Sequence, residues 1–127
     1  MTGRAEFEQL LRELHAARVA GRLDTLCALF DQQARFRIAG TSDGKPVAIA
    51  ASGLDEIRTW LTMLVKTFRL SGYELLSSTL DGQRGALHWR ADINSRITGS
   101  RVATELVDLV ECRNQLITSY TEFFIPR

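Results

Sequence analysis

Three sets of side chains in this sequence have the types and spacing that acid–base chemistry needs. His88, Arg90 and Asp92 alternate along residues 87–93, so in a strand they share one face, with neighbours about 7 Å apart. Asp108 interrupts the apolar run 106–110, and Glu122 lies among the aromatic residues of 120–124. Two carboxylates around one guanidinium can divide the work, because one can activate water while the other protonates a leaving oxygen.

Each of these residues also has a structural interpretation that stays open at this level. If the polar side of 87–93 faces water, Arg90 and Asp92 form a surface pair that contributes under about 1 kcal/mol. Asp108 would need a partner if buried, such as Arg90 or a backbone amide. His15 lies at the edge of an apolar helical stripe beside Leu11 and Leu14, where a structural role is favoured.

The elements that must position these groups follow from periodicity. Apolar residues at helical spacing predict a helix over 4–20 that Gly21 ends, and a short second helix from about residue 23. Residues 34–38 predict a strand, and 39–52 a long loop with at most a short strand at 47–50. A capping box of Ser52 and Asp55 opens a third helix. Four strands follow, over 70–80, 84–97, 101–113 and 115–125.

This order, helices first and then an antiparallel meander, predicts the α+β class. The strand 101–113 is apolar on both faces: Val102, Leu106 and Val110 lie on one, and Val107 and Leu109 on the other. A sheet covered on one side alone has a polar outer face. We therefore expect a homodimer through the outer face of the sheet.

Composition narrows the class of function. The chain has 127 residues, with sixteen Lys and Arg against fifteen Asp and Glu, which predicts one domain over 1–127 and argues against a nucleic-acid partner. No apolar run suits a signal peptide or a membrane span, so we expect a cytoplasmic protein. Cys27 and Cys112 lack ligand spacing and are expected in the core. No nucleotide-binding or metal-binding motif is present, so we expect no cofactor and no metal.

Three stretches and the order of the elements resemble the SnoaL-like branch of the nuclear transport factor 2 superfamily. The stretches are residues 21–31, 53–61 and 115–124. The resemblance covers nearly the whole chain. It implies a cone-shaped α+β barrel, in which three N-terminal helices pack on a curved, mainly antiparallel sheet around one deep pocket. Such domains are commonly dimers.

Within that superfamily the residues match parts of three activity patterns. The chain is similar to limonene epoxide hydrolase at Arg90, Asp92 and Glu122, although Phe36 and Ile38 stand where that family has a water-positioning tyrosine and asparagine. It resembles ketosteroid isomerase at one position alone.

Asp108 aligns with the oxyanion aspartate of ketosteroid isomerase. Leu14 and Ile38 stand where that enzyme has its tyrosine and its catalytic base. Polyketide cyclases and dehydratases use Asp/His pairs, which His88 or His15 could form with Asp108. No pattern is complete.

The sequence therefore predicts a pocket that binds a mostly apolar small molecule, and a cofactor-free acid–base enzyme of the hydrolase, isomerase or dehydratase kind. The alternative is a non-catalytic dimer that binds a ligand or another protein. The expected catalytic residues are Arg90, Asp92, Glu122, Asp108 and His88. The expected wall residues are Phe36, Trp60, Phe68, Tyr120 and Phe124.

Overall fold

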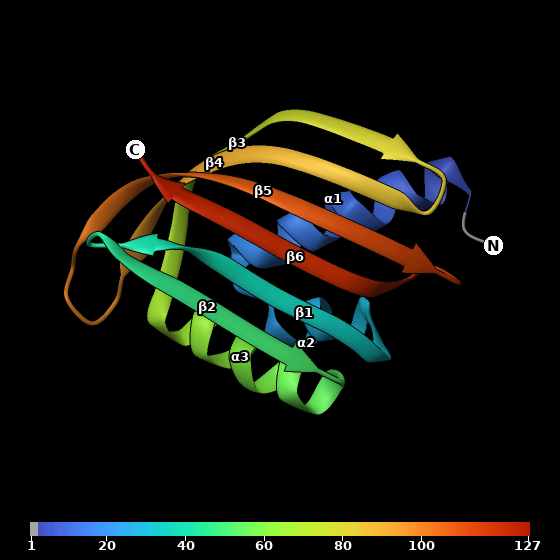
Figure 1. The fold of residues 1–127 in the computed structure, drawn as a ribbon, viewed down its shortest axis with the longest axis horizontal. Coiled ribbons are helices and arrows are strands. Elements are labelled where there is room, and N and C mark those ends of the chain that lie inside the picture. Colours follow the sequence, from blue (N-terminus) through green and yellow to red (C-terminus); the bar gives the residue numbers. More distant parts are fainter. Residues whose placement is uncertain (1–2) are drawn as a thin grey trace.

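The computed structural model describes residues 3–127, in which three helices lie on one side of a curved sheet (Figure 1). The helices are α1 (Arg4–Ala20), α2 (Leu23–Ala28) and α3 (Leu54–Thr67). Gly21 ends α1 in the left-handed region, with φ 69°, and its N–H donates to the carbonyls of Ala17 and Arg18. The predicted helix over 4–20 is confirmed. No helix in the described part of the chain is long and apolar enough to cross a membrane.

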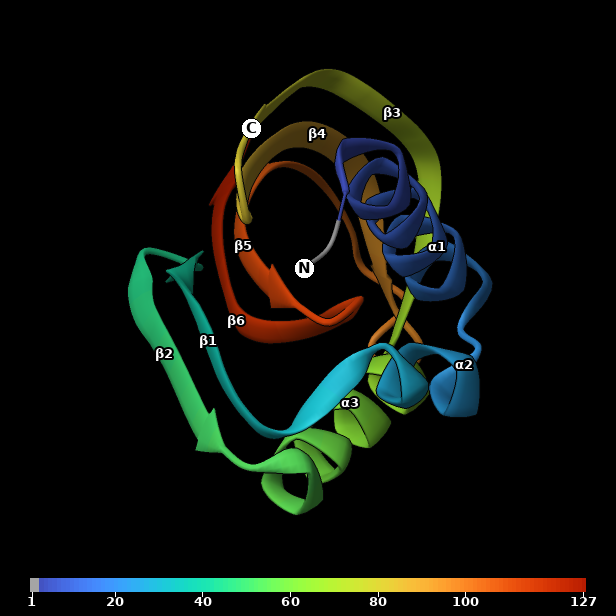
Figure 2. The ribbon, with the colours of Figure 1, turned by 90° about the vertical axis from the view of Figure 1, so that its right-hand side faces the viewer.

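Six strands form one sheet in the order β2-β1-β6-β5-β4-β3. They are β1 (Phe30–Ser42), β2 (Lys45–Ser52), β3 (Phe68–Asp81), β4 (Arg84–Ser95), β5 (Arg101–Arg113) and β6 (Leu116–Pro126). β1 runs parallel to β6, and every other neighbouring pair is antiparallel. The sheet curls towards the helices but does not close, because β2 and β3 remain its edges (Figure 2). The α+β class and the helix-on-curved-sheet architecture are confirmed.

Two local predictions are wrong. Residues 39–52 form no long loop, because β1 and β2 make a hairpin around Asp43 and Gly44, whose φ values are 53° and 74°. Asp-Gly is a strong signal for a two-residue hairpin turn that needs positive φ at both positions. Helix α3 has Gly53 rather than Ser52 at its N-cap, without a side-chain cap bond. The Ser52 N–H instead donates to Oε1 of Glu56 at 2.9 Å.

The core lies between the helices and the concave face of the sheet. In β4, the side chains of Leu87, Trp89 and Ala91 are buried on this face. Trp89 is 0% exposed, so it belongs to the core and not to the outer face through which we expected a dimer. Cys27 and Cys112 are buried, as expected. Burying the more apolar side of β4 removes more apolar area from water than burying its other side would. The polar side of β4 therefore points outwards.

Candidate active site at the closed end of an apolar cavity

A cavity of about 570 Å³ lies between the helices and the concave face of the sheet. Its mouth is at the end of the molecule that carries the β1–β2 hairpin, the β4–β5 connection and the end of β6 (Figure 1). Aliphatic and aromatic side chains make most of its wall. These include Ile38, Val47, Ile49, Leu64, Phe68, Leu70, Ile93 and Phe124. A volume of this order suits a drug-sized ligand.

The charged groups in the inner wall of this cavity are Arg18 of α1 and Glu122 of β6. Two guanidinium nitrogens of Arg18 donate to the two Glu122 oxygens, at 2.8 and 3.1 Å. The side chains are 12% and 2% exposed, so the ion pair is nearly buried. The Tyr120 hydroxyl donates to Glu122 Oε2 at 2.5 Å. This bidentate geometry, with a third donor, holds the carboxylate in one orientation.

These contacts set the charge state of the pair. Burial raises the pKa of Glu122, but the charge and hydrogen bonds of Arg18, with the hydrogen bond from Tyr120, outweigh burial and lower it below its ordinary value. Burial and the nearby carboxylates of Asp108 and Glu122 raise the pKa of Tyr120 well above its ordinary value, so its hydroxyl keeps its proton. Glu122 is therefore an anion that faces a permanent cation.

Asp108 of β5 lies directly across the strand pair from Glu122 and is 0% exposed. Its Oδ2 is 2.9 Å from Nε2 of His15, whose Nδ1 is 2.6 Å from the Tyr73 hydroxyl. Burial and the charge of Glu122 raise the pKa of Asp108 to about 6, although His15 and Arg18 oppose the shift. Two neighbouring carboxyl groups thus differ in proton affinity, the arrangement that separates an acid from a base.

Tyr73, His15 and Asp108 form a continuous chain of polar contacts. Burial and the charge of Asp108 raise the pKa of Tyr73, so its hydroxyl keeps its proton beside Nδ1 of His15. The imidazole thus links the Tyr73 hydroxyl on one side to the Asp108 carboxyl group on the other. His15 and Tyr73 also line a second cavity of about 700 Å³, between α1 and β3. Glu122 therefore borders the first cavity, and Asp108 contacts a residue that borders the second.

Two buried polar atoms near this chain lack a hydrogen-bond partner within residues 3–127: Asp108 Oδ1 and Trp89 Nε1. The indole ring of Trp89 contacts the imidazole of His15, with 4.8 Å between centroids, and Cζ of Arg18 lies 5.9 Å from the indole centroid. An unsatisfied buried polar atom costs about 1–3 kcal/mol.

The structure does not bring His88, Arg90 and Asp92 to Glu122, so the predicted common cluster is wrong. All three lie on the outer face of β4, where they form ion pairs across the strands. Arg90 pairs with Glu74 at 2.5 Å, Asp92 with Arg101 at 2.6 Å, and His88 with Glu105. The reason is the placement of Trp89, because its burial turns its alternate neighbours outwards.

The predicted wall residues divide into two groups. Phe68 and Phe124 line the cavity. Phe36 and Tyr120 are buried beneath it and stack on each other, with 5.5 Å between ring centroids, and Trp60 packs against the core from α3. Asp108 and Glu122 are both buried, in keeping with the apolar and aromatic residues that surround them in the sequence.

Arg18 is the residue of this candidate site that the sequence did not suggest to us. Leu11, Leu14, His15 and Arg18 follow one another at helical spacing, so two polar side chains continue the buried stripe of α1. The sequence did contain a signal for Arg18, because this long polar residue occupies a position of the helix that the apolar stripe predicts to face the core. No group of three or more His, Cys, Asp or Glu side chains suited to a metal ion occurs among the described residues.

Solved structures with this architecture confirm the fold. An NTF2-like protein from Burkholderia xenovorans has 18% identity and a TM-score of 0.79, over 98% of this chain and 92% of that one. A LEH-like epoxide hydrolase from M. tuberculosis has 14% identity and a TM-score of 0.73, over 94% and 83%. A protein with a ketosteroid isomerase-like fold from Catenulispora acidiphila has 14% identity and a TM-score of 0.70, over 89% and 82%.

At these identities the similarity shows the fold and leaves the reaction open. No curated protein matches the chain significantly in sequence. The sequence profile of the SnoaL-like domain matches residues 11–120, from the middle of α1 to the middle of β6. This match includes both Arg18 and Asp108. The chain therefore belongs to the SnoaL-like domain family.

Proposed function

We propose that this protein binds a mostly apolar small molecule in the cavity and acts on it as a cofactor-free acid–base enzyme. The observation that supports the proposal best is the pair of buried carboxyl groups at the closed end of an apolar cavity. Glu122 and Asp108 are cross-strand neighbours whose pKa values shift in opposite directions around Arg18. Charged groups placed deep in an apolar site are costly and are typical of catalytic or binding sites.

In the proposed reaction Arg18 binds an oxygen atom of the substrate. Its bonds to Glu122 and Tyr120 use one N–H of Nη2 and both of Nη1, which leaves Nε–H and a second N–H of Nη2 as donors. As a substrate oxygen draws Arg18 away from Glu122, the carboxylate loses stabilisation and becomes a stronger base. Glu122 would then accept a proton from water or from a carbon beside the bound oxygen.

Asp108 would serve as a proton reservoir behind Glu122. It is fully buried, so it reaches the substrate through Glu122 and is a positioning residue rather than a catalytic one. A pKa of about 6 lets Asp108 exist in both protonation states near neutral pH. His15 and Tyr73 hold it from the opposite side.

The experiment is a turnover panel of apolar epoxides, enones and hydroxy ketones, analysed by mass spectrometry, with matched variants. We expect Glu122→Gln to lower kcat by about 100-fold or more, as for loss of a general base. Asp108→Asn should move the pH profile while leaving KM nearly unchanged. Arg90→Gln, on the outer face, is the control and should behave like the wild type. Equal turnover by wild type and Glu122→Gln would refute the catalytic role.

A non-catalytic ligand-binding protein is the second candidate, because both oxygens of Glu122 already have strong partners. In that case the ion pair serves as a polar anchor at the end of an apolar cavity. Retention of a small molecule through purification, together with no turnover across the panel, would favour this candidate. Native mass spectrometry of the purified protein makes that comparison directly.

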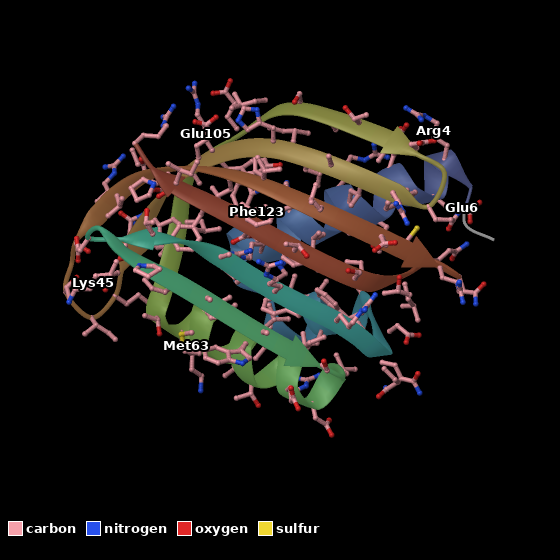
Figure 3. All side chains as sticks on the ribbon, in the orientation of Figure 1. Arg4, Glu6, Lys45, Met63, Glu105 and Phe123 are labelled. Atoms are coloured by element: carbon pink, nitrogen blue, oxygen red, sulfur yellow. The ribbon has the colours of Figure 1, made fainter. Side chains whose placement is uncertain are left out.

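We also propose that the protein forms a homodimer through the outer face of the sheet. Leu109 on β5, and Phe123 and Ile125 on the neighbouring β6, are 44%, 38% and 64% exposed. Figure 3 shows Phe123 on the outer face of the sheet. An apolar area of this kind on a sheet face is typical of an interface. Sedimentation should give twice the 14.2 kDa chain mass at micromolar concentration. A monomer under these conditions would contradict the proposal, and Leu109→Lys should produce one.

A further inference from the structure

The mouth of the cavity carries cationic side chains that have no acidic partner. Arg69, at the start of β3, and Arg96, just after β4, both belong to the lining and are exposed. Neither arginine forms an ion pair within residues 3–127. Arg90 on the outer face, by contrast, pairs with Glu74. The inner Arg18, by contrast, is neutralised by Glu122. The uncompensated positive charge of the cavity therefore lies at its entrance.

The surroundings of the mouth strengthen this imbalance. Asp92 at this end is held by Arg101 at 2.6 Å, and Asp43 at the hairpin tip has Lys45 two residues away. Lys66, in the last turn of α3, adds another cation beside Arg69. Figure 3 shows Lys45 at this end of the molecule, and Arg4 and Glu6 together at the opposite end. At the far end, by contrast, arginines do have acidic partners, since Arg4 pairs with Glu8 and Arg84 with Glu111.

We infer that the natural ligand of the cavity is an apolar compound with an anionic head group, bound with its head between Arg69 and Arg96 at the mouth. This inference rests on the proposed function, because it assumes that the cavity holds the ligand. The hydroxyl groups of Thr41, Ser42 and Ser100 also line the entrance and can donate to an anion.

This placement orients the ligand. An anionic head at the inner end would be repelled by the Glu122 carboxylate, which already neutralises the charge of Arg18. The apolar body follows the wall of Phe68, Leu70 and Ile93, so the end remote from the head group meets Arg18 and Glu122. The reacting group would thus lie at the tail of an amphipathic molecule. The field at a cationic mouth also steers anions towards it.

The test compares three probes with similar alkyl chains and different head groups: decanoate, decanamide and decyltrimethylammonium. Titration calorimetry is carried out below the concentrations at which they form micelles, at a pH where decanoate is ionised. We expect decanoate to bind about tenfold more tightly than decanamide, a difference of about 1.4 kcal/mol that two exposed ion contacts can supply. Decyltrimethylammonium should bind more weakly than either. Salt should reduce the preference for decanoate.

A double variant, Arg69→Gln with Arg96→Gln, locates the effect. It should bind decanoate and decanamide about equally, with decanamide affinity unchanged from the wild type. The matched control, Arg35→Gln with Arg113→Gln, removes the same charge from exposed positions outside the cavity lining and should keep the preference. All four positions are exposed, so each variant should unfold at the wild-type temperature.

The outcomes separate this inference from the proposed function. If decanamide binds as tightly as decanoate to the wild type, the cavity is a binding site and the anionic-ligand inference is wrong. If the control variant loses the preference as fully as the mouth variant does, general charge rather than the mouth is responsible, and the inference is also wrong. If none of the three probes binds, the ligand-binding cavity itself is refuted.

Discussion

Replacing Asp108 by asparagine should change how the stability of the protein depends on pH. Asp108 is fully buried, and its pKa rises from an ordinary 3.8 to about 6, chiefly through burial and the charge of Glu122. A carboxyl group with a raised pKa binds its proton more tightly in the folded protein than in the unfolded chain. Its stabilising contribution is full below about pH 3.8 and is lost as the pH rises through about 6.

The size of this loss follows from the difference between the two pKa values, which corresponds to about 3 kcal/mol in the free energy of unfolding. The asparagine side chain would have no charge to desolvate, and its amide oxygen can still accept the hydrogen bond from His15. The variant should therefore gain about 3 kcal/mol relative to the wild type between pH 4 and 7. Glu122 has the opposite effect, because its lowered pKa makes the free energy of unfolding fall as the pH is lowered. Glu122 is present in the wild type and in Asp108→Asn, so its contribution cancels from the difference between them.

Urea unfolding followed by tryptophan fluorescence, at a series of pH values, measures this difference. Asp92→Asn is the control, because Asp92 lies on the outer face in an ion pair with exposed Arg101 and should change stability by less than about 1 kcal/mol. A difference between wild type and Asp108→Asn that is constant with pH would refute the reasoning. A relative gain for the wild type as pH rises would also refute it, since Asp108 would then be stabilised as an anion.

Two further predictions concern the ion pair and the sheet. Glu122→Gln leaves Arg18 as a buried charge without a counterion and should cost about 3–5 kcal/mol in urea unfolding, whereas combining Arg18→Met with Glu122→Leu should cost less than the single change. If the double variant is the less stable, the pair stabilises the fold outright. Gly40→Ala should cost about 1–3 kcal/mol in thermal unfolding, because a Cβ there would meet the backbone oxygen and ring of Phe124. Wild-type stability for this variant would show that β1 and β6 can separate freely.

The element order follows from local patterns and is largely confirmed. Helical spacing located α1 within 4–20, and strand alternation located the four strands of the meander. The hairpin formed by β1 and β2 was missed because small residues, Gly40 and Pro46 suggested a loop. Asp43-Gly44 carried the correct signal, since a turn with two positive φ values selects these residue types.

The candidate site was half predictable. Asp108 and Glu122 stand out in sequence because each carboxylate has apolar or aromatic neighbours, and both are buried together. The partner assigned to them was wrong, because alternation shows that Arg90 and Asp92 share a face without showing which face is concave. The curvature of the sheet and the burial of Trp89 make that choice. Arg18 replaces Arg90 as the cation, from a helix that is distant in sequence.

The charges of this protein also show what the sequence determines and what the fold determines. Sixteen cationic and fifteen acidic side chains make the protein nearly neutral, and composition alone argues against a polyanion as partner. Where those charges gather depends on which chain segments meet at one end of the sheet. Folding brings the ends of α3 and β4 together and leaves Arg69 and Arg96 beside one cavity mouth. Local periodicity is a property of neighbouring residues, whereas a site is made by contacts between distant ones.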